Sequence, residues 1–207
     1  LYSLINGVSY GLSVWLTLEA LKVIDVSVFY PIRRLNNPIV AILLAIVLHE
    51  ILKITQIIAV ILAVISVLVF QTLKLPKKEL KYTILVLFLM VMASFFSKLG
   101  SYSKEEFMSF SYLISSLTLI VLMCITKQFP KKDEIGWGVL AGIINFTAFF
   151  SLLYALEKLP GSLVYPLVGA NLILISFFAS ILFKEKLTKR WGLAFVLAIS
   201  SFFLAFL

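Results

Sequence analysis

The stretch LEALKVIDVSVFYPI (residues 18–32) has a similar counterpart later in the chain, LYALEKLPGSLVYPL (residues 153–167). The offset from position 18 to position 153 is 135, and the same register continues on both sides without a gap. The matching pairs include Gly7 and Gly142, Ser27 and Ser162, Tyr30 and Tyr165, Pro31 and Pro166, Asn36 and Asn171, and Glu50 and Glu185. Leucine and alanine coincide by chance in apolar sequences. A shared Tyr-Pro, Asn and Glu at one register instead indicates an internal repeat.

The composition places this repeat in a membrane. Of the 207 residues, 62% are hydrophobic, and the mean hydropathy is +1.10, whereas a soluble domain is about half apolar. The net charge of +8 comes from lysines at the ends of apolar segments, where they meet lipid headgroups, and this placement argues against a nucleic-acid partner. The sequence therefore predicts an integral multi-pass protein, which we expect in the plasma membrane.

Eight windows are long and apolar enough for membrane helices, which need about 20 mostly apolar residues. The windows are 1–21, 26–48, 54–73, 80–97, 107–126, 136–156, 162–183 and 191–207. The charged breaks between them are short, so consecutive helices should be antiparallel. The predicted fold class is an all-α polytopic membrane protein.

The repeat predicts that its two copies are inverted in the bilayer. Five steps lead from the first window to its equivalent, the sixth, so equivalent helices run in opposite directions. Inverted repeats are typical of secondary transporters, whose substrate site lies near the midplane at the repeat interface. The second copy (80–207) has two helices before its aligned part, and the first copy (1–73) lacks them. We therefore expect a ten-helix protein of two five-helix units, with two helices preceding residue 1.

A motif in each copy points to a family. NPIVAILLAIVLHEIL, residues 37–52, resembles the fourth helix of an EamA-type repeat in the drug/metabolite transporter superfamily, where a Gly-Glu loop follows the helix. Glu50 matches the glutamate, and His49 replaces the glycine. LFKEKLTKRWGLAFVLAISSFFLAFL, residues 182–207, is similar to the end of such a repeat, with Lys184 replacing the glycine. The resemblance implies two inverted five-helix repeats around a central cavity and movement of a small solute by alternating access. For Glu50 itself, helix capping or charge pairing is expected rather than solute contact.

Positive charge is divided unequally between the two predicted sides of the membrane. One side carries Lys22, Lys74, Lys77, Lys78, Lys81, Lys127, Lys131, Lys132, Lys184, Lys186, Lys189 and Arg190. The other carries Lys53, Lys98, Lys104 and Lys158. Since cytoplasmic loops are enriched in lysine and arginine, we expect the first side to be cytoplasmic.

Arg33 and Arg34 lie about seven residues, or roughly 10 Å, into the window 26–48. From there a side chain can reach the headgroups, or it can face an internal cavity. Adjacent helical residues point about 100° apart, so we expect one of the two to face the cavity. A guanidinium in the cavity would bind a carboxylate or phosphate group of the solute. Glu19 is a coupling candidate if it pairs with such an arginine, and the alternative is a surface pair with Lys22.

Other polar residues inside apolar windows complete the predicted site, because amides are costly in lipid and should face the interior. The predicted substrate-binding set is Arg33, Arg34, Asn36, Asn37, Asn145, Tyr154, Asn171, Tyr30 and Tyr165. The alternatives are bridging between helices for the amides and interfacial anchoring for the tyrosines. The prolines predicted to kink or start helices beside the cavity are Pro31, Pro38 and Pro166.

Two glycine pairs and one lysine are predicted to have structural roles. Gly7-x-x-x-Gly11 and Gly138-x-x-x-Gly142 predict close helix contacts. Lys98, at the end of its window, is expected to extend toward the headgroups.

No catalytic or metal-binding constellation stands out in the sequence. His49 and Cys124 are the single histidine and the single cysteine, and the apolar surroundings of Cys124 predict a buried structural thiol. We therefore expect no enzyme activity, metal or cofactor. No P-loop motif is present, so energy would come from a gradient or from exchange.

The leading interpretation is a secondary transporter. A lipid flippase or a membrane-embedded accessory subunit is the alternative, which a laterally open polar groove would favour. Expected partners are a small solute, with an anion as the specific expectation, the bilayer and a coupling ion. The sequence is compatible with a homodimer but does not determine the oligomeric state.

Overall fold

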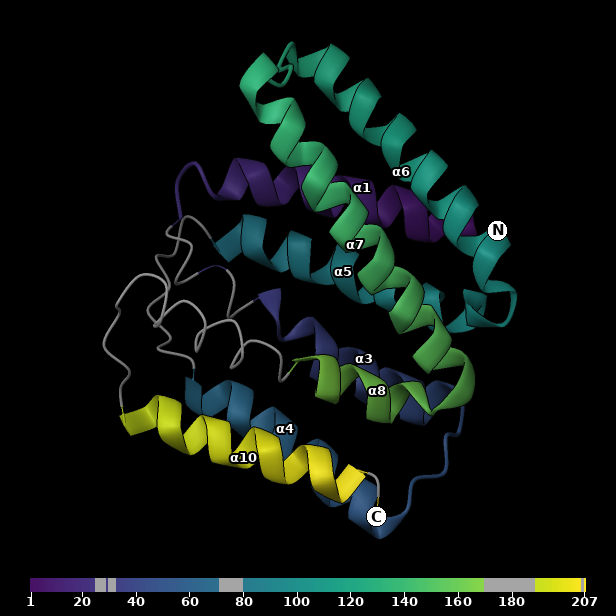
Figure 1. Cartoon of the computed structure of the whole chain (residues 1–207), viewed down its shortest axis with the longest axis vertical. Helices are drawn as coiled ribbons and strands as arrows, with labels where there is room; N and C mark the ends of the chain where they lie inside the picture. Colours follow the sequence, from purple (N-terminus) through teal and green to yellow (C-terminus); the bar gives the residue numbers. More distant parts are fainter. Residues whose placement is uncertain (25–28, 30–32, 71–79, 170–188, 206) are drawn as a thin grey trace.

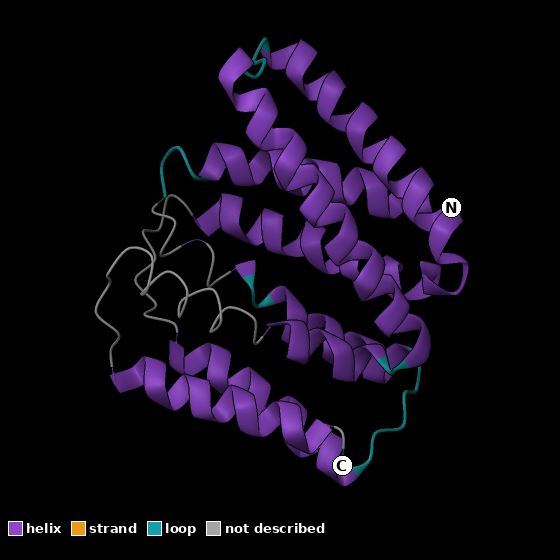
Figure 2. Cartoon of the chain, in the orientation of Figure 1, coloured by secondary structure: helices purple, strands orange, loops and turns teal. Residues whose placement is uncertain are grey.

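The computed structural model describes residues 1–24, 29, 33–70, 80–169, 189–205 and 207, and every element in these ranges is a helix (Figure 2). The elements are α1 (Tyr2–Ala20), α3 (Asn36–Val47), α4 (Ile54–Phe70), α5 (Leu80–Gly100), η1 (Ser101–Ser103), α6 (Lys104–Thr126), α7 (Lys132–Lys158), α8 (Gly161–Gly169) and α10 (Lys189–Ala205). Each of the predicted windows contains a described helix, so the all-α class is confirmed.

The described helices have the composition of membrane segments. Two stretches are long and apolar enough to cross a bilayer, Lys81–Thr126 and Lys132–Lys158, and Asn36–Val47, Ile54–Ser66 and Gly192–Ala205 are shorter apolar helices. Large apolar side chains face outward, as Phe203 does with 68% of its surface exposed. Such a surface suits lipid rather than water. The number of crossings and the inversion of the repeat stay predictions.

The helices form a stack of packed pairs (Figure 1). α1 packs against both α5 and α6, α3 packs against α8 and α5, and α4 packs against α10 and α8. The pair α4–α10 joins helices that occupy equivalent positions in the sequence repeat, because 54–70 shifted by 135 gives 189–205. α4 and α10 lie side by side at one end of the molecule and α6 lies at the other, while α7 runs from the α6 end toward α8 (Figure 1).

Two glycines on α1 allow its close approach to α6. A Cβ on Gly7 would lie 2.7 Å from the backbone oxygen of Ser111, and a Cβ on Gly11 would lie 3.0 Å from that of Ser115. The packing role predicted for Gly7-x-x-x-Gly11 is confirmed. Gly138 and Gly142 differ, because no described atom lies within 4 Å of a Cβ built on either residue.

The chain between the first windows departs from one continuous helix. Residues 34 and 35 form a turn, and α3 begins at Asn36. Pro38 therefore lies in the first turn of α3, where an N–H would have no intrahelical partner, so it begins the helix without the predicted kink. Pro166 lies inside α8, whereas Pro31 lies outside the described residues.

Cys124 is exposed, so the prediction of a buried thiol was wrong.

Candidate functional site

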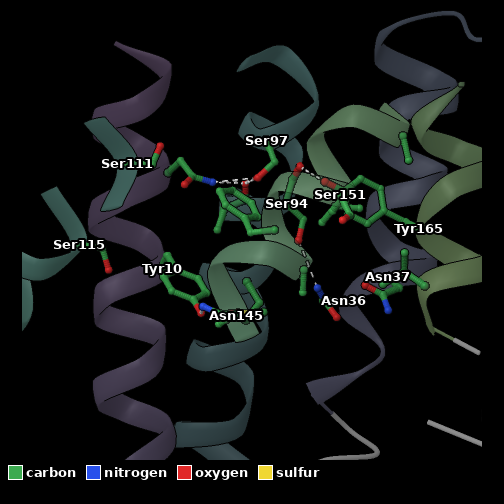
Figure 3. Close-up of a pocket in the computed structure, with 18 of the residues that line it drawn as sticks. Tyr10, Asn36, Asn37, Ser94, Ser97, Ser111, Ser115, Asn145, Ser151 and Tyr165 are labelled. Atoms are coloured by element: carbon green, nitrogen blue, oxygen red, sulfur yellow. Dashed lines mark hydrogen bonds between the residues drawn. The ribbon is translucent and has the colours of Figure 1, made fainter. Parts of the chain in front are cut away.

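A cavity of about 630 Å³ lies among the helices, and it takes polar groups from most of them (Figure 3). Its polar lining residues are Asn6, Tyr10, Arg33, Arg34, Asn36, Asn37, Ser94, Ser97, Ser111, Tyr112, Ser115, Asn145, Ser151 and Tyr165. Apolar side chains that include Met90, Phe149, Leu152 and Val168 complete the wall. A wall that combines polar and apolar side chains suits a small solute with one polar and one apolar end.

Asn145 joins three helices at one part of the wall. Its amide nitrogen donates to the hydroxyl of Tyr10 on α1 at 3.0 Å and to the hydroxyl of Tyr112 on α6 at 3.3 Å (Figure 3). Tyr10 and Asn145 differ by 135 positions, so they occupy equivalent places in the two sequence copies. A hydrogen bond between equivalent positions is expected where two related halves meet.

A second group of hydrogen bonds connects α1 with α5. The amide nitrogen of Asn6 donates to the backbone oxygen of Ala93 at 2.6 Å and to the hydroxyl of Ser97 at 3.0 Å. Asn6 is only 4% exposed, so these bonds satisfy an amide that would be costly to bury alone. These hydrogen bonds hold the face of α5 that carries Ser94 and Ser97 at a defined distance from α1.

Arg33 and Arg34 both line the cavity and are half-buried. The expectation that one would face it assumed a regular helix with 100° between neighbours. The turn at residues 34 and 35 breaks that geometry, so the expectation was wrong. The terminal nitrogen of Arg33 lies 3.6 Å from the sulfur of Met90. None of the described residues that line the cavity is acidic, and Arg33 and Arg34 are the charged residues among them.

The α3–α8 side of the cavity contains three of the predicted residues. The amide of Asn36 donates to the hydroxyl of Ser94 at 3.3 Å, and the hydroxyl of Tyr165 donates to the backbone oxygen of Ser94 (Figure 3). The buried amide nitrogen of Asn37 has no hydrogen-bond partner among the described residues, and a buried polar group normally has one. All three residues line the cavity, and their predicted contact with a solute stays a prediction.

Other predicted residues lie elsewhere. Tyr154 is 54% exposed and lies against the ammonium groups of Lys104 and Lys158, at 5.5 and 6.0 Å from the ring centre. It lies nine residues after Asn145, and nine steps of about 100° bring a side chain to the opposite face of the helix. The assignment of Tyr154 to the cavity was therefore wrong.

Glu19 forms the surface pair with Lys22, at 2.6 Å, and is not among the lining residues. This is the alternative that the i, i+3 spacing predicted. Tyr30 and Asn171 lie outside the described residues, so their predicted roles stay predictions.

Several residues of the wall were not predicted from the sequence. Asn6 and Tyr10 on α1 and Ser111 and Ser115 on α6 line the cavity. Each pair has i, i+4 spacing, which places both members on one face of a helix. A search for polar residues at this spacing in apolar windows would have found them.

Comparison with known proteins identifies the second half of the chain most clearly. A family model described as the EamA-like transporter family matches residues 77–207. A search of curated proteins finds no match. A solved structure described only as "Crystal structure of protein" has the same fold, with a TM-score of 0.79 and 15% sequence identity. The match covers 98% of this chain and 76% of that chain.

Proposed function

Since the chain belongs to the EamA-like transporter family, a family of membrane transporters of small solutes, we propose that it is a secondary transporter of a polar or amphipathic metabolite. The solute would occupy the cavity, and the two repeat copies would expose it to each side in turn. The plasma membrane is the proposed location. Because the sequence has no P-loop, the proposed energy source is an ion gradient, exchange or the gradient of the solute itself.

The cavity carries this proposal because both predicted copies contribute to its wall. α1 and α3 come from the first copy, and α5 to α8 come from the second. The Tyr10–Asn145 hydrogen bond joins equivalent positions of the two copies. Transporters built from inverted repeats bind substrates at such an interface.

The two guanidinium groups in the cavity wall favour an anionic solute. Arg33 and Arg34 are the charged side chains among the described lining residues, and a guanidinium binds carboxylate or phosphate with two parallel hydrogen bonds. Serine and asparagine side chains from α3 and α5 can donate further bonds to the same group. The apolar wall at Phe149 and Leu152 would contact the carbon skeleton.

Uptake into proteoliposomes tests both parts of the proposal. The full-length chain would be assayed with a panel of labelled metabolites that contains anionic, neutral and cationic members of similar size. We expect transport of an anionic member. Arg33→Gln and Arg34→Gln should each raise its KM about tenfold or more, because a hydrogen bond to a charged group contributes about 1.5–3 kcal/mol.

Lys158→Gln is the matched control, because Lys158 is 59% exposed and pairs with Glu157 outside the cavity. It should leave KM unchanged. Transport that is equal in both arginine variants and the parent would remove these residues from the site. Absence of transport for every class of solute would contradict the proposed function.

A further inference from the structure

A buried carboxylate from the first copy holds the start of a helix in the second. Glu50, in the loop after α3, accepts hydrogen bonds from the backbone N–H groups of Gly161 and Ser162, both at 2.8 Å. It also accepts one from the hydroxyl of Ser162 at 2.6 Å. These N–H groups belong to the first turn of α8, where no intrahelical acceptor exists. A carboxylate at this position also interacts favourably with the positive end of the helix dipole.

A buried lysine completes the same junction from the other direction. Lys98 at the end of α5 is 6% exposed, and its ammonium donates to the backbone oxygens of Leu156 at 2.6 Å and Leu159 at 3.0 Å. Pro160 has no N–H to offer the oxygen of Leu156, so Lys98 satisfies a carbonyl at the end of α7 that the chain leaves without a partner. The expectation that Lys98 extends to the headgroups was wrong.

The two charges also face each other. The Lys98 nitrogen lies 3.7 Å from a Glu50 oxygen, and the side chains are 7% and 10% exposed. Each charge is therefore stabilised by a helix end and by its neighbour. Removing either one would leave an unpaired buried charge together with unpaired backbone groups, a more severe change than loss of an exposed ion pair.

The backbone before Glu50 directs its side chain into the junction. His49 has φ of 49°, in the left-handed region, and it follows the end of α3 where such a residue commonly terminates a helix. Glycine adopts this conformation without a steric penalty. The Gly-Glu loop of the family resemblance thus has a geometric explanation: the first residue turns the chain and the second caps α8.

This junction lies at one end of the cavity. Along α3 the order is Asn37, which lines the cavity, then the buried Val40 and Leu44, and then Glu50. Leu44 packs so closely against α8 that a Cβ on Gly161 would lie 2.5 Å from its methyl group. An apolar layer and the ion pair Glu50–Lys98, which we call the latch, therefore close this end of the site. They belong to the region where α3, α5, α7 and α8 come together (Figure 1).

We propose that the latch holds the cavity closed on the side of Lys98 and must separate when that side opens. Since α3 and α8 belong to different copies of the repeat, movement of one copy against the other removes Glu50 from the first turn of α8. Separation leaves both charges and the helix ends to be hydrated, so the closed and open states are distinct. This inference rests on the proposed transport by alternating access.

Side-specific labelling of a cavity cysteine tests the latch. In the full-length chain, Cys124→Ser removes the exposed native thiol, and Ser97→Cys places a thiol on the buried cavity wall. A membrane-impermeant maleimide is added to right-side-out and to inverted vesicles, so that each side is probed separately. Glu50→Gln and Lys98→Met are the test variants. Glu157→Gln is the matched control, since it removes a partly exposed pair with Lys104 at the same side.

Glu50→Gln and Lys98→Met should each raise the labelling rate from the Lys98 side about tenfold, equivalent to about 1.4 kcal/mol in favour of the open state. Glu157→Gln should not change the rate, and Glu50→Asp, which retains the charge, should restore part of the protection. Equal labelling in all variants, or an equal increase from both sides, would overturn the proposal. If Glu50→Gln does not fold, Lys98→Met and Glu50→Asp decide the question. Labelling does not depend on transport. If the variants show the expected labelling but the protein transports no solute, the proposed function is contradicted and the latch is supported.

Discussion

Replacing Gly7 by valine tests the contact between α1 and α6. A Cβ at this position would lie 2.7 Å from the oxygen of Ser111 and 2.8 Å from the Cβ of Ile114, whereas ordinary contacts begin at 3.4 Å. The helices would have to separate by about 0.7 Å, the difference between 3.4 and 2.7 Å, and one of the obstructing atoms is backbone and cannot rotate away. Overpacking of this kind costs about 1–3 kcal/mol.

Valine has a slightly better helix propensity than glycine, by a few tenths of a kcal/mol, which offsets little of this cost. We therefore expect Gly7→Val to lower the free energy of unfolding by about 2 kcal/mol. For a chain of this size that corresponds to a fall in Tm of about 4–8 °C. The measurement is thermal unfolding of the detergent-solubilised protein followed by tryptophan fluorescence.

Gly142→Val is the matched control, because Gly142 is the repeat equivalent of Gly7 and no described atom lies within 4 Å of its added Cβ. Its Tm should stay within about 2 °C of the parent value. An unchanged Tm for Gly7→Val would refute the packing argument. An equal loss in both variants would show that valine in these helices is unfavourable whatever it contacts.

Three further perturbations follow from local features. His49→Gly should raise the free energy of unfolding by about 1 kcal/mol by relieving a left-handed backbone, and His49→Val should lower it; the Tm of the two variants should move in opposite directions. Asn6→Ala should lower the free energy of unfolding by about 1–2 kcal/mol, because the hydrogen bonds to Ala93 and Ser97 are lost. An unchanged Tm would count against those hydrogen bonds. Cys124 is exposed, so a membrane-permeant maleimide should label it in the folded protein, and resistance until unfolding would contradict its placement.

The sequence predicted the helices well because the signal is local. Apolar windows separated by short charged breaks give the helical segments, and the i, i+4 glycine motif at Gly7 and Gly11 gives a packed face of α1. The same local reasoning could have separated Asn145 from Tyr154, since nine residues at about 100° each place them on opposite faces. Their joint assignment to the site neglected that periodicity.

Other features could not be predicted in this way, because they depend on where a regular element ends. Arg33 and Arg34 both reach the cavity since a turn interrupts the helix between them and α3. Lys98 is buried because the end of α7 offers it backbone oxygens. These oxygens belong to residues far from Lys98 in the sequence.

By itself, the sequence determined the all-helical class, the apolar character of the segments and the 135-residue repeat, because each depends on composition, spacing or register along one chain. Only the tertiary structure decided which polar residues share a cavity. The bond between Tyr10 and Asn145 and the junction of Glu50 with Lys98 and α8 join residues from different helices. Burying an amide or a charge is favourable only when a partner from another helix meets it, and that meeting is a property of the folded chain.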